Sequence, residues 1–308
     1  QLQKVVCVSL AAFAAVCLNA TATSATWSGA NDSAWSNTSN WSANPVPGTG
    51  DTATFDNAGS SHVTIDLAGG VTVSNLLFDT VNAAAYTIGS GGAGNQTLTL
   101  NNGGMVIRSS TVTNSQMINA NLTLGTASGG NYTMTNVAAM GTLTLAGAIA
   151  GGVGGAKTLK VTGSNTTIIC SGITNGSASS LAIDINGSAQ VTLSGKISGN
   201  TKVTQSVATF GAPTGKSLTI TNDANDFTGQ FSALGAYNSK VYFTSIANYG
   251  IACSLGKGTV GTTISLSNGW LVYTGAVDSS SDRTWSGVNS NQIQNDGAGV
   301  LTLRGSLV

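Results

Sequence analysis

The chain of 308 residues has no glutamate, a single histidine, three prolines and only 11 lysine and arginine residues. Charged residues make up 7% of the sequence, and the formal net charge is zero. Coiled coils and helical bundles are rich in Glu, Lys and Arg, so this composition excludes them. Nucleic-acid binders carry a basic stripe, which eleven scattered cations cannot supply, so we expect no nucleic-acid partner.

The residues that are abundant are small and polar. The chain contains 41 Gly, 41 Thr, 37 Ser and 28 Asn, which is nearly half of its length. Leu, Ile, Val and Phe together number 70, which is enough to build an apolar core. The composition therefore indicates an uncharged, strand-forming protein.

The segment 1–22 has the pattern of a signal peptide, with a possible second cleavage site after Ala25. Lys4 is its only charge, Val5 to Leu18 is an apolar run, and Ala20 and Ala22 are small residues where a signal peptidase reads. We expect a secreted chain whose mature part does not span a membrane. Leu301 to Val308 has the pattern of a strand cut short, so we expect the repeat region to continue beyond it.

Two of the four cysteines, Cys7 and Cys17, fall in this leading segment. Cys170 and Cys253 lie far apart in the remainder of the sequence. The spacing is compatible with one disulfide or with two separate buried thiols.

Alternation of apolar and polar residues is the strongest local pattern. Thr97–Leu100, Asn121–Leu124 and Thr142–Leu145 place Leu on one face and Thr or Asn on the other, as half-buried strands do. Related leucines recur at irregular intervals, namely Leu98, Leu122, Leu143 and Leu159. These intervals favour the coils of an all-β solenoid, a parallel β-helix, over the shorter repeat of a β-sandwich array, which is the alternative fold.

Stacked coils would place identical side chains in ladders, in which Thr, Ser and Asn are tolerated and like charges repel. The segment 26–80 holds Trp27, Trp35 and Trp41, and we predict that these aromatics cap the open end of the core. Residues 81–308 would then form the β-helix repeat region.

Several stretches resemble bacterial proteins with autotransporter-associated β-strand repeats. They are Thr26–Gly29, Asp51–Phe55 and Val71–Phe78 near the start, and Leu218–Gly229, Asn268–Gly275, Asp282–Trp285 and Gly297–Gly305 further on. The resemblance implies a right-handed parallel β-helix, secreted or displayed on the bacterial cell surface, with any outer-membrane anchor outside this chain.

The sequence gives only weak support for four possible chemical sites: a phosphate loop, a carboxylate pair, a metal site and a polysaccharide-lyase groove. Gly211–Ser217 ends in Gly-Lys-Ser, but its glycine spacing is short and a strand follows, so a phosphate loop is not expected. Asp223 and Asp226 could form a carboxylate pair, but both sit in a turn-forming repeat motif.

His62 near Asp56 and Asp66 could bind a metal ion, although a histidine on a solvated strand is the simpler interpretation. A polysaccharide-lyase groove would need clustered acids and a base. The available cations are dispersed along the chain: Arg108, Lys157, Lys160, Lys196, Lys202 and Lys216.

We therefore predict a structural or adhesive surface protein without catalytic residues, cofactor or metal, with self-assembly into extracellular filaments as a variant. Its partners would be other surface proteins, glycans or copies of itself. The alternative is a carbohydrate-active or carbohydrate-binding β-helix, in which Trp270, Tyr273 and Trp285 would form an exposed aromatic face. Packing of these aromatics in the core is the competing interpretation.

Overall fold

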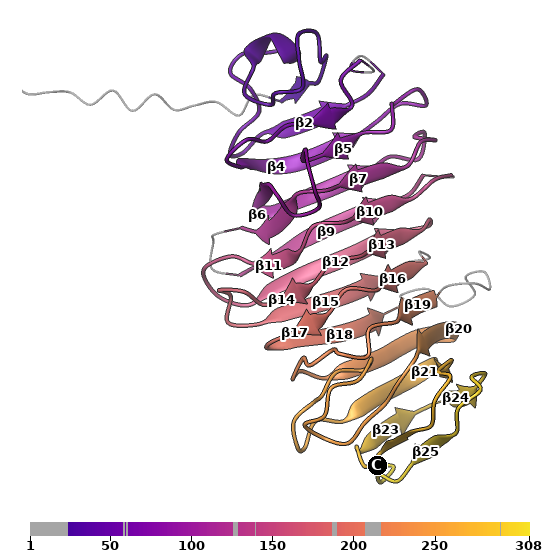
Figure 1. Cartoon of the computed structure of the whole chain (residues 1–308). Helices are drawn as coiled ribbons and strands as arrows, with labels where there is room; N and C mark the ends of the chain where they lie inside the picture. Colours follow the sequence, from indigo (N-terminus) through magenta and orange to yellow (C-terminus); the bar gives the residue numbers. More distant parts are fainter. Residues whose placement is uncertain are drawn as a thin grey trace, which may run out of the picture.

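A computed structural model describes residues 24–57, 59, 61–125, 129–138, 140–186, 190–206, 217–289 and 291–308. The predicted signal peptide, 1–22, lies outside this part. With the alternative cleavage after Ala25, only its last two residues would be described. The described chain is a stack of short strands along one axis, running from the indigo N-terminal end to the yellow C-terminal end (Figure 1). Within these residues only the 3₁₀ turn η1 (Thr38–Asn40) is helical, and no helix is long and apolar enough to cross a membrane.

Three parallel ladders run along the stack. Ladder 1 contains β1 (Ala25–Thr26), β2 (Thr52–Phe55), the second halves of β4 (Val71–Phe78) and β6 (Thr97–Arg108), β9 (Gly130–Asn136), β12 (Lys157–Gly163), β15 (Leu181–Asn186), β18 (Thr201–Ser206), the first parts of β20 (Phe231–Phe243) and β21 (Ile264–Tyr273), and β23 (Trp285–Val288).

Ladder 2 contains β3 (Thr64–Ile65), β5 (Thr87–Ile88), β7 (Gln116–Ile118), β10 (Leu143–Leu145), β13 (Thr167–Ile169), β16 (Val191–Leu193), β19 (Ser217–Ile220), the ends of β20 and β21, and β24 (Gln292–Asn295). Ladder 3 contains the starts of β4 and β6, β8 (Asn121–Leu124), β11 (Ile149–Gly151), β14 (Ile173–Thr174) and β17 (Ile197–Ser198). A separate parallel pair joins β22 (Ser279–Ser281) to β25 (Leu301–Leu303).

Every paired strand in the described chain is parallel to its neighbour, which confirms the predicted β-helix. A β-sandwich pairs antiparallel strands, so the alternative fold is excluded. The solenoid also begins earlier than residue 81, because β2 already pairs with β4 and β4 with β6. The segment predicted as a cap, 26–80, therefore contributes turns of the stack as well as its end.

The turn length explains the irregular leucine spacing. Leu159 pairs with Ile183, Thr167 with Val191 and Ile173 with Ile197, so all three ladders advance by the same number of residues in this part of the chain. Leu98 and Leu122 are one such turn apart on ladder 3. Leu143 and Leu159 lie on ladders 2 and 1, so the shorter intervals connect different faces and are not repeats.

The core is built by side chains that stack on their own counterparts. The inward column of ladder 2 is an unbroken apolar series in which each residue pairs with the next one along the axis: Ile65, Ile88, Ile118, Leu145, Ile169, Leu193, Ile220, Phe243 and Tyr273. All nine are buried. Burying such a side chain contributes roughly 1.5–3 kcal/mol, so stability accumulates turn by turn.

The three tryptophans pack together at the N-terminal end, as predicted for a cap. The rings of Trp27 and Trp41 are 5.1 Å apart and those of Trp35 and Trp41 4.7 Å apart, both edge to face. Each indole N–H donates to a backbone carbonyl, at His62, Pro47 and Trp35 respectively for Trp27, Trp35 and Trp41. The cluster rests on Phe55 of the first full turn, so it closes the apolar column.

Asp32 organises the loop that carries this cluster. Its carboxylate accepts hydrogen bonds from the side chains of Asn37 (2.9 Å) and Asn40 (2.7 Å) and from the amide of Ala34 (2.8 Å). These bonds, with that from Asn37 the largest cause, lower the pKa of Asp32 to about 2.

The pH response of the cap follows from Asp32. The pKa of Asp32 in the folded chain lies below its unfolded value of about 3.9. The ionised carboxylate therefore stabilises the loop fully above about pH 3.9, and this stabilisation is lost progressively as the pH falls toward 2. We expect the fluorescence of the buried tryptophans to change over this range in the native chain. In Asp32→Asn the change should be reduced, whereas Asp296→Asn, at the other end, should behave as the native chain. An identical acid transition in all three proteins would contradict this role.

Glycine is required where a corner of one turn touches the turn before it. A Cβ on Gly195 would lie 1.7 Å from the Ser171 carbonyl oxygen, whereas a Cβ on Gly69 would meet nothing within 4 Å. We expect Gly195→Ala to lower the free energy of unfolding by about 3 kcal/mol. Gly69→Ala should leave it unchanged, and urea denaturation followed by circular dichroism measures both. Equal stability of the two variants would show that the corner relaxes without cost.

Candidate functional site

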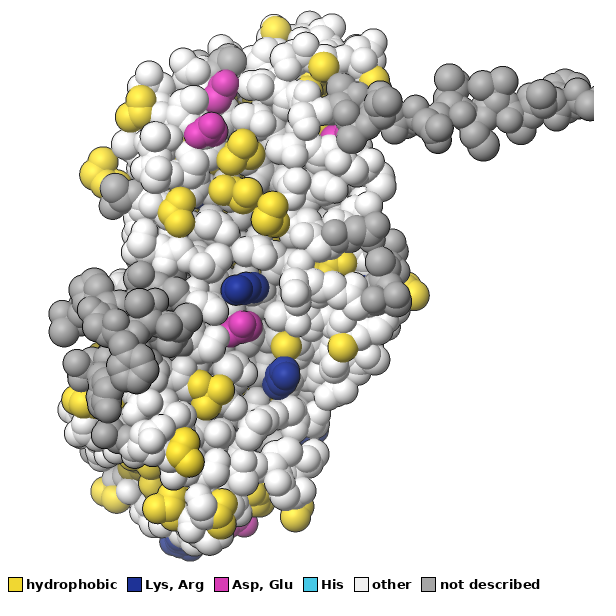
Figure 2. Space-filling view, turned by 180° about the vertical axis from the view of Figure 1, so that it is seen from behind, with side chains coloured by type: hydrophobic (Ala, Val, Ile, Leu, Met, Phe, Trp, Pro, Cys, Tyr) yellow, Lys and Arg dark blue, Asp and Glu magenta, His cyan; other side chains and the backbone are white. Residues whose placement is uncertain are grey.

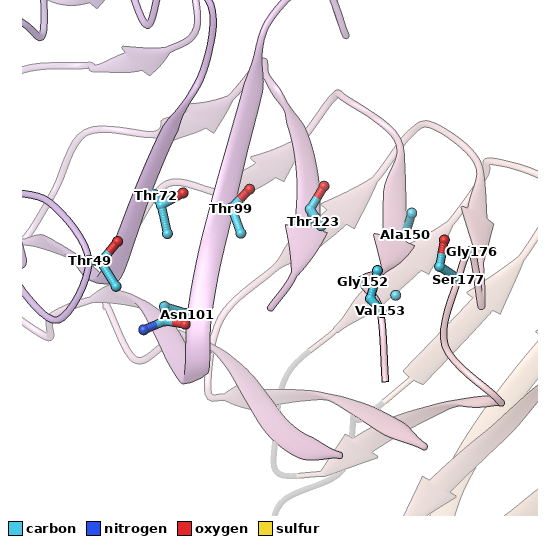
Figure 3. A pocket seen from close by; sticks show the side chains of 11 residues that line it. Thr49, Thr72, Thr99, Asn101, Thr123, Ala150, Gly152, Val153, Gly176 and Ser177 are labelled. Carbon is cyan, nitrogen blue, oxygen red and sulfur yellow. The ribbon is translucent and has the colours of Figure 1, made fainter. Parts of the chain in front are cut away.

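A hollow on the described surface follows the outward side of ladder 3. Thr72 of β4 pairs with Thr99 of β6, Thr99 with Thr123 of β8, and Thr123 with Ala150 of β11. These outward side chains form the floor of an open hollow of about 560 Å³. Thr49 lies at one end of it and Ser177 at the other, so it extends along the solenoid axis (Figure 3).

The floor is a row of evenly spaced hydroxyl groups. Neighbouring strands are about 4.8 Å apart, which sets the interval between successive threonines. The hydroxyl oxygens of Thr72, Thr99 and Thr123 lie on the same side of the row (Figure 3). None of the three makes a hydrogen bond to another described residue, so all three are available to a ligand.

The hollow is free of charge. Its lining residues are Thr, Asn, Ser, Gly, Ala and Val, and none of them is ionisable. The walls are partly bare backbone at Gly151 and Gly152. A Cβ on Gly152 would lie 2.2 Å from the Gly125 carbonyl oxygen, and a Cβ on Gly151 would lie 2.5 Å from the Asn175 carbonyl oxygen, so neither position has room for a side chain. The face of the molecule in Figure 2 likewise carries few charged side chains, and dark blue and magenta ones lie near one another around its middle. The sequence could not reveal this site, because the register that aligns the threonines was not known from it.

The basic residues that the sequence singled out and the structure describes do not all lie on one surface. Arg108 and Lys157 are buried, and the Arg108 guanidinium donates to Asn136 Oδ1 (3.0 Å) and to the carbonyls of Asn114 and Val112. Burial lowers the pKa of both side chains. Lys160 is the register partner of Asp184 in ladder 1. Lys216 lies outside the described residues.

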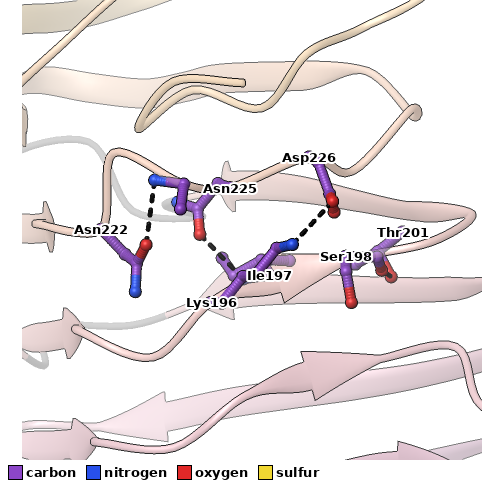
Figure 4. Close-up of polar contacts among 8 residues, drawn as sticks. Lys196, Ile197, Ser198, Thr201, Asn222, Asn225 and Asp226 are labelled. Carbon is purple, nitrogen blue, oxygen red and sulfur yellow. Dashed lines mark hydrogen bonds and ion pairs between the residues drawn. The ribbon is translucent and has the colours of Figure 1, made fainter. Parts of the chain in front are cut away.

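The two carboxylates of the repeat motif serve different contacts. Asp226 forms an ion pair with Lys196 (2.7 Å; Figure 4). Asp223 instead accepts hydrogen bonds from the hydroxyls of Thr244 and Ser245, each at 2.6 Å. Both therefore hold turns together, as the turn interpretation of the motif predicted. The Gly-Lys-Ser motif cannot be compared in the same way, because 211–216 lie outside the described part.

Asn225 is the central residue of this motif. Its Oδ1 accepts from the Ile197 amide of the preceding turn (2.7 Å; Figure 4). Its Nδ2 donates to the Ser254 carbonyl of the following turn (2.9 Å). Asn121 and Asn136 also bridge a preceding and a following turn. A side-chain amide provides both a donor and an acceptor, so Asn can join three turns at a corner.

His62 belongs to the cap and not to a solvated strand. Its Nδ1 contacts the Gly29 carbonyl oxygen at 2.6 Å, and its own carbonyl accepts from Trp27 Nε1. Because a carbonyl oxygen only accepts, Nδ1 carries the proton in this tautomer. The Asp66 carboxylate accepts hydrogen bonds from the side chains of Gln96 and Ser90 and from the Ala68 amide. The bond from Ala68 is the largest cause of the lowered pKa of Asp66. No group of three possible metal ligands occurs among the described residues.

The prediction of an exposed aromatic face is wrong for two of its three members. Tyr273 and Trp285 are buried, because both occupy inward positions of the solenoid, so core packing is the correct interpretation. Trp270 points outward from β21 and is half-buried. It lies beside its ladder neighbour Lys240, whose Nζ is 5.0 Å from the ring centroid.

The possible disulfide is not formed. Cys170 and Cys253 are both free; Cys170 is exposed and Cys253 is buried, so only Cys253 fits the alternative of buried thiols. The Cys253 thiol donates to the Gly256 carbonyl (3.0 Å), and burial raises its pKa. A protonated buried thiol is a poor nucleophile, so Cys253 has a packing role.

The asparagine bridge can be tested with a change of one atom. In Asn225→Asp a carboxylate replaces the amide donor opposite the Ser254 carbonyl, in a fully buried position. We expect the free energy of unfolding at neutral pH to fall by about 3 kcal/mol. The matched control Asn131→Asp changes an exposed side chain and should have no measurable effect. Equal denaturation midpoints for both variants would show that the bridge does not contribute to stability.

The comparisons with known proteins agree with the fold. No family model matches the chain, and no solved structure does. Over 155 residues, half of this chain, the sequence is 37% identical to the adhesin BmaC autotransporter of Brucella suis biovar 1 (strain 1330). The matched part is only 4% of that protein's length, so the chain corresponds to a small section of this relative. The similarity and the parallel β-solenoid together fit a β-helix of the autotransporter-associated passenger type, as the motifs indicated.

Proposed function

We propose that this chain is an adhesive section of a cell-surface or secreted bacterial β-helix and that it works without catalysis. The observation that carries the proposal is the neutral row of free threonine hydroxyls along ladder 3, on a solenoid related in sequence to an adhesin. A rigid stack of turns projects such a row away from the cell. Contact then depends on many weak polar interactions in series.

A non-enzymatic role is supported by how the ionisable residues are used. Asp223 and Asp226 bind different neighbours, and Arg108 and Lys157 are buried inside the turns. The half-buried Trp270 is the one aromatic of the expected binding face that is accessible to a partner. A carbohydrate-active β-helix would instead place a base and acids around one groove, and the hollow on ladder 3 offers neither.

Adhesion can be measured directly. Beads coated with the chain lacking its predicted signal segment should be retained on epithelial cells or extracellular matrix under flow. Beads coated with the same chain after heat denaturation should detach, because the row of hydroxyls exists only in the folded stack. Equal detachment of both kinds of bead from every surface tested would overturn the proposal.

Filament formation is a second candidate, suggested by strand edges that can template pairing between chains. Electron microscopy of the purified chain distinguishes the two. Isolated short rods support a monomeric adhesive section, whereas long regular fibres would make self-assembly the main activity.

A further inference from the structure

We propose that the hollow on ladder 3 binds a single unbranched, uncharged, β-linked polysaccharide chain lying along the solenoid axis. This inference rests on the proposed adhesive function and specifies the class of ligand. The direction, the charge and the chemistry of the hollow each support it.

The direction of the hollow favours an extended polymer. Its floor crosses successive strands, from Thr72 through Thr99 and Thr123 to Ala150, and does not follow any one of them. A peptide that binds by strand addition needs a free sheet edge parallel to itself, which this floor does not offer. Successive threonines of the floor are about 4.8 Å apart, so an extended chain of sugar rings lying along the row can contact several of them.

The absence of charge in the lining selects a neutral glycan. Sulfated or acidic polysaccharides are bound through Arg and Lys, which form charge-assisted hydrogen bonds to their anions. The residues that line the hollow include neither. An acidic glycan would lose its hydration here and gain no counter-charge.

The threonine side chain suits the two kinds of surface that a sugar presents. Its hydroxyl can donate to and accept from sugar hydroxyls, and its methyl can contact the C–H groups of the ring. Thr72, Thr99 and Thr123 keep these hydroxyls free of other described residues. Ala150 and the largely exposed Val153 add apolar contact at the far end. Each contact is weak, so binding requires several sugar rings in sequence.

The test uses cellohexaose, chitohexaose and a heparin-derived sulfated hexasaccharide as probes in isothermal titration calorimetry. The native chain should bind at least one of the two neutral probes more tightly than the sulfated one. The double variant Thr99→Val/Thr123→Val keeps the methyl groups and removes two hydroxyls. We expect it to bind about 25-fold more weakly, or roughly fivefold for each hydrogen bond lost.

The matched control is Thr144→Val/Thr192→Val, which removes two outward hydroxyls from ladder 2, away from the hollow. It should bind like the native chain. Circular dichroism and urea denaturation should show that both double variants fold. Failure of both neutral probes to bind at millimolar concentration, or equal binding by the two double variants, would overturn the inference. Tighter binding of the sulfated probe would also overturn it.

The same variants separate this inference from the proposed function. Beads that carry Thr99→Val/Thr123→Val and adhere as well as native beads would show that adhesion uses another surface. Adhesion would then stand and the polysaccharide site would fall. Native beads that fail to adhere while the native chain still binds a neutral hexasaccharide would overturn the adhesive role and leave the site in place.

Discussion

Parallel register between successive turns is the constraint on which the rest of this structure depends. Each turn lies about 4.8 Å from the next, so a side chain on a paired strand has a counterpart at about that distance on the neighbouring turn. Inward, this produces the unbroken column from Ile65 to Tyr273. Outward, it produces rows of hydroxyls. A column of like charges at the same interval would repel itself, so the low charge of the sequence is a consequence of the stacking.

The corners between strands need a different solution, since regular ladder bonding stops there. Asn121, Asn136 and Asn225 each reach a turn before and a turn after their own. The guanidinium of Arg108 satisfies carbonyl groups inside one such corner. Glycines fill the positions where backbones approach most closely, as Gly195 does. The abundance of Asn and Gly is thus tied to the number of corners.

Most of the fold could be predicted from local sequence, because the strand pattern, the turn residues and the tryptophan cluster each have a local cause. The alternating leucines identified individual strands, and Trp27, Trp35 and Trp41 identified the closed end. What could not be predicted depends on register. Without it, leucines on different faces resembled one irregular repeat, and Tyr273 and Trp285 could not be assigned to the inward face. The row Thr72, Thr99 and Thr123 is drawn from three turns and forms only when they align.

The neutral outer surface has a consequence for where such a protein can work. Long-range electrostatic attraction speeds the approach of charged partners, but it is screened within about 8 Å at physiological ionic strength. A solenoid with a formal net charge of zero and few charged side chains does not depend on that attraction. Contacts made by neutral hydroxyls, as the proposed adhesive function requires, form only at short range and depend little on ionic strength.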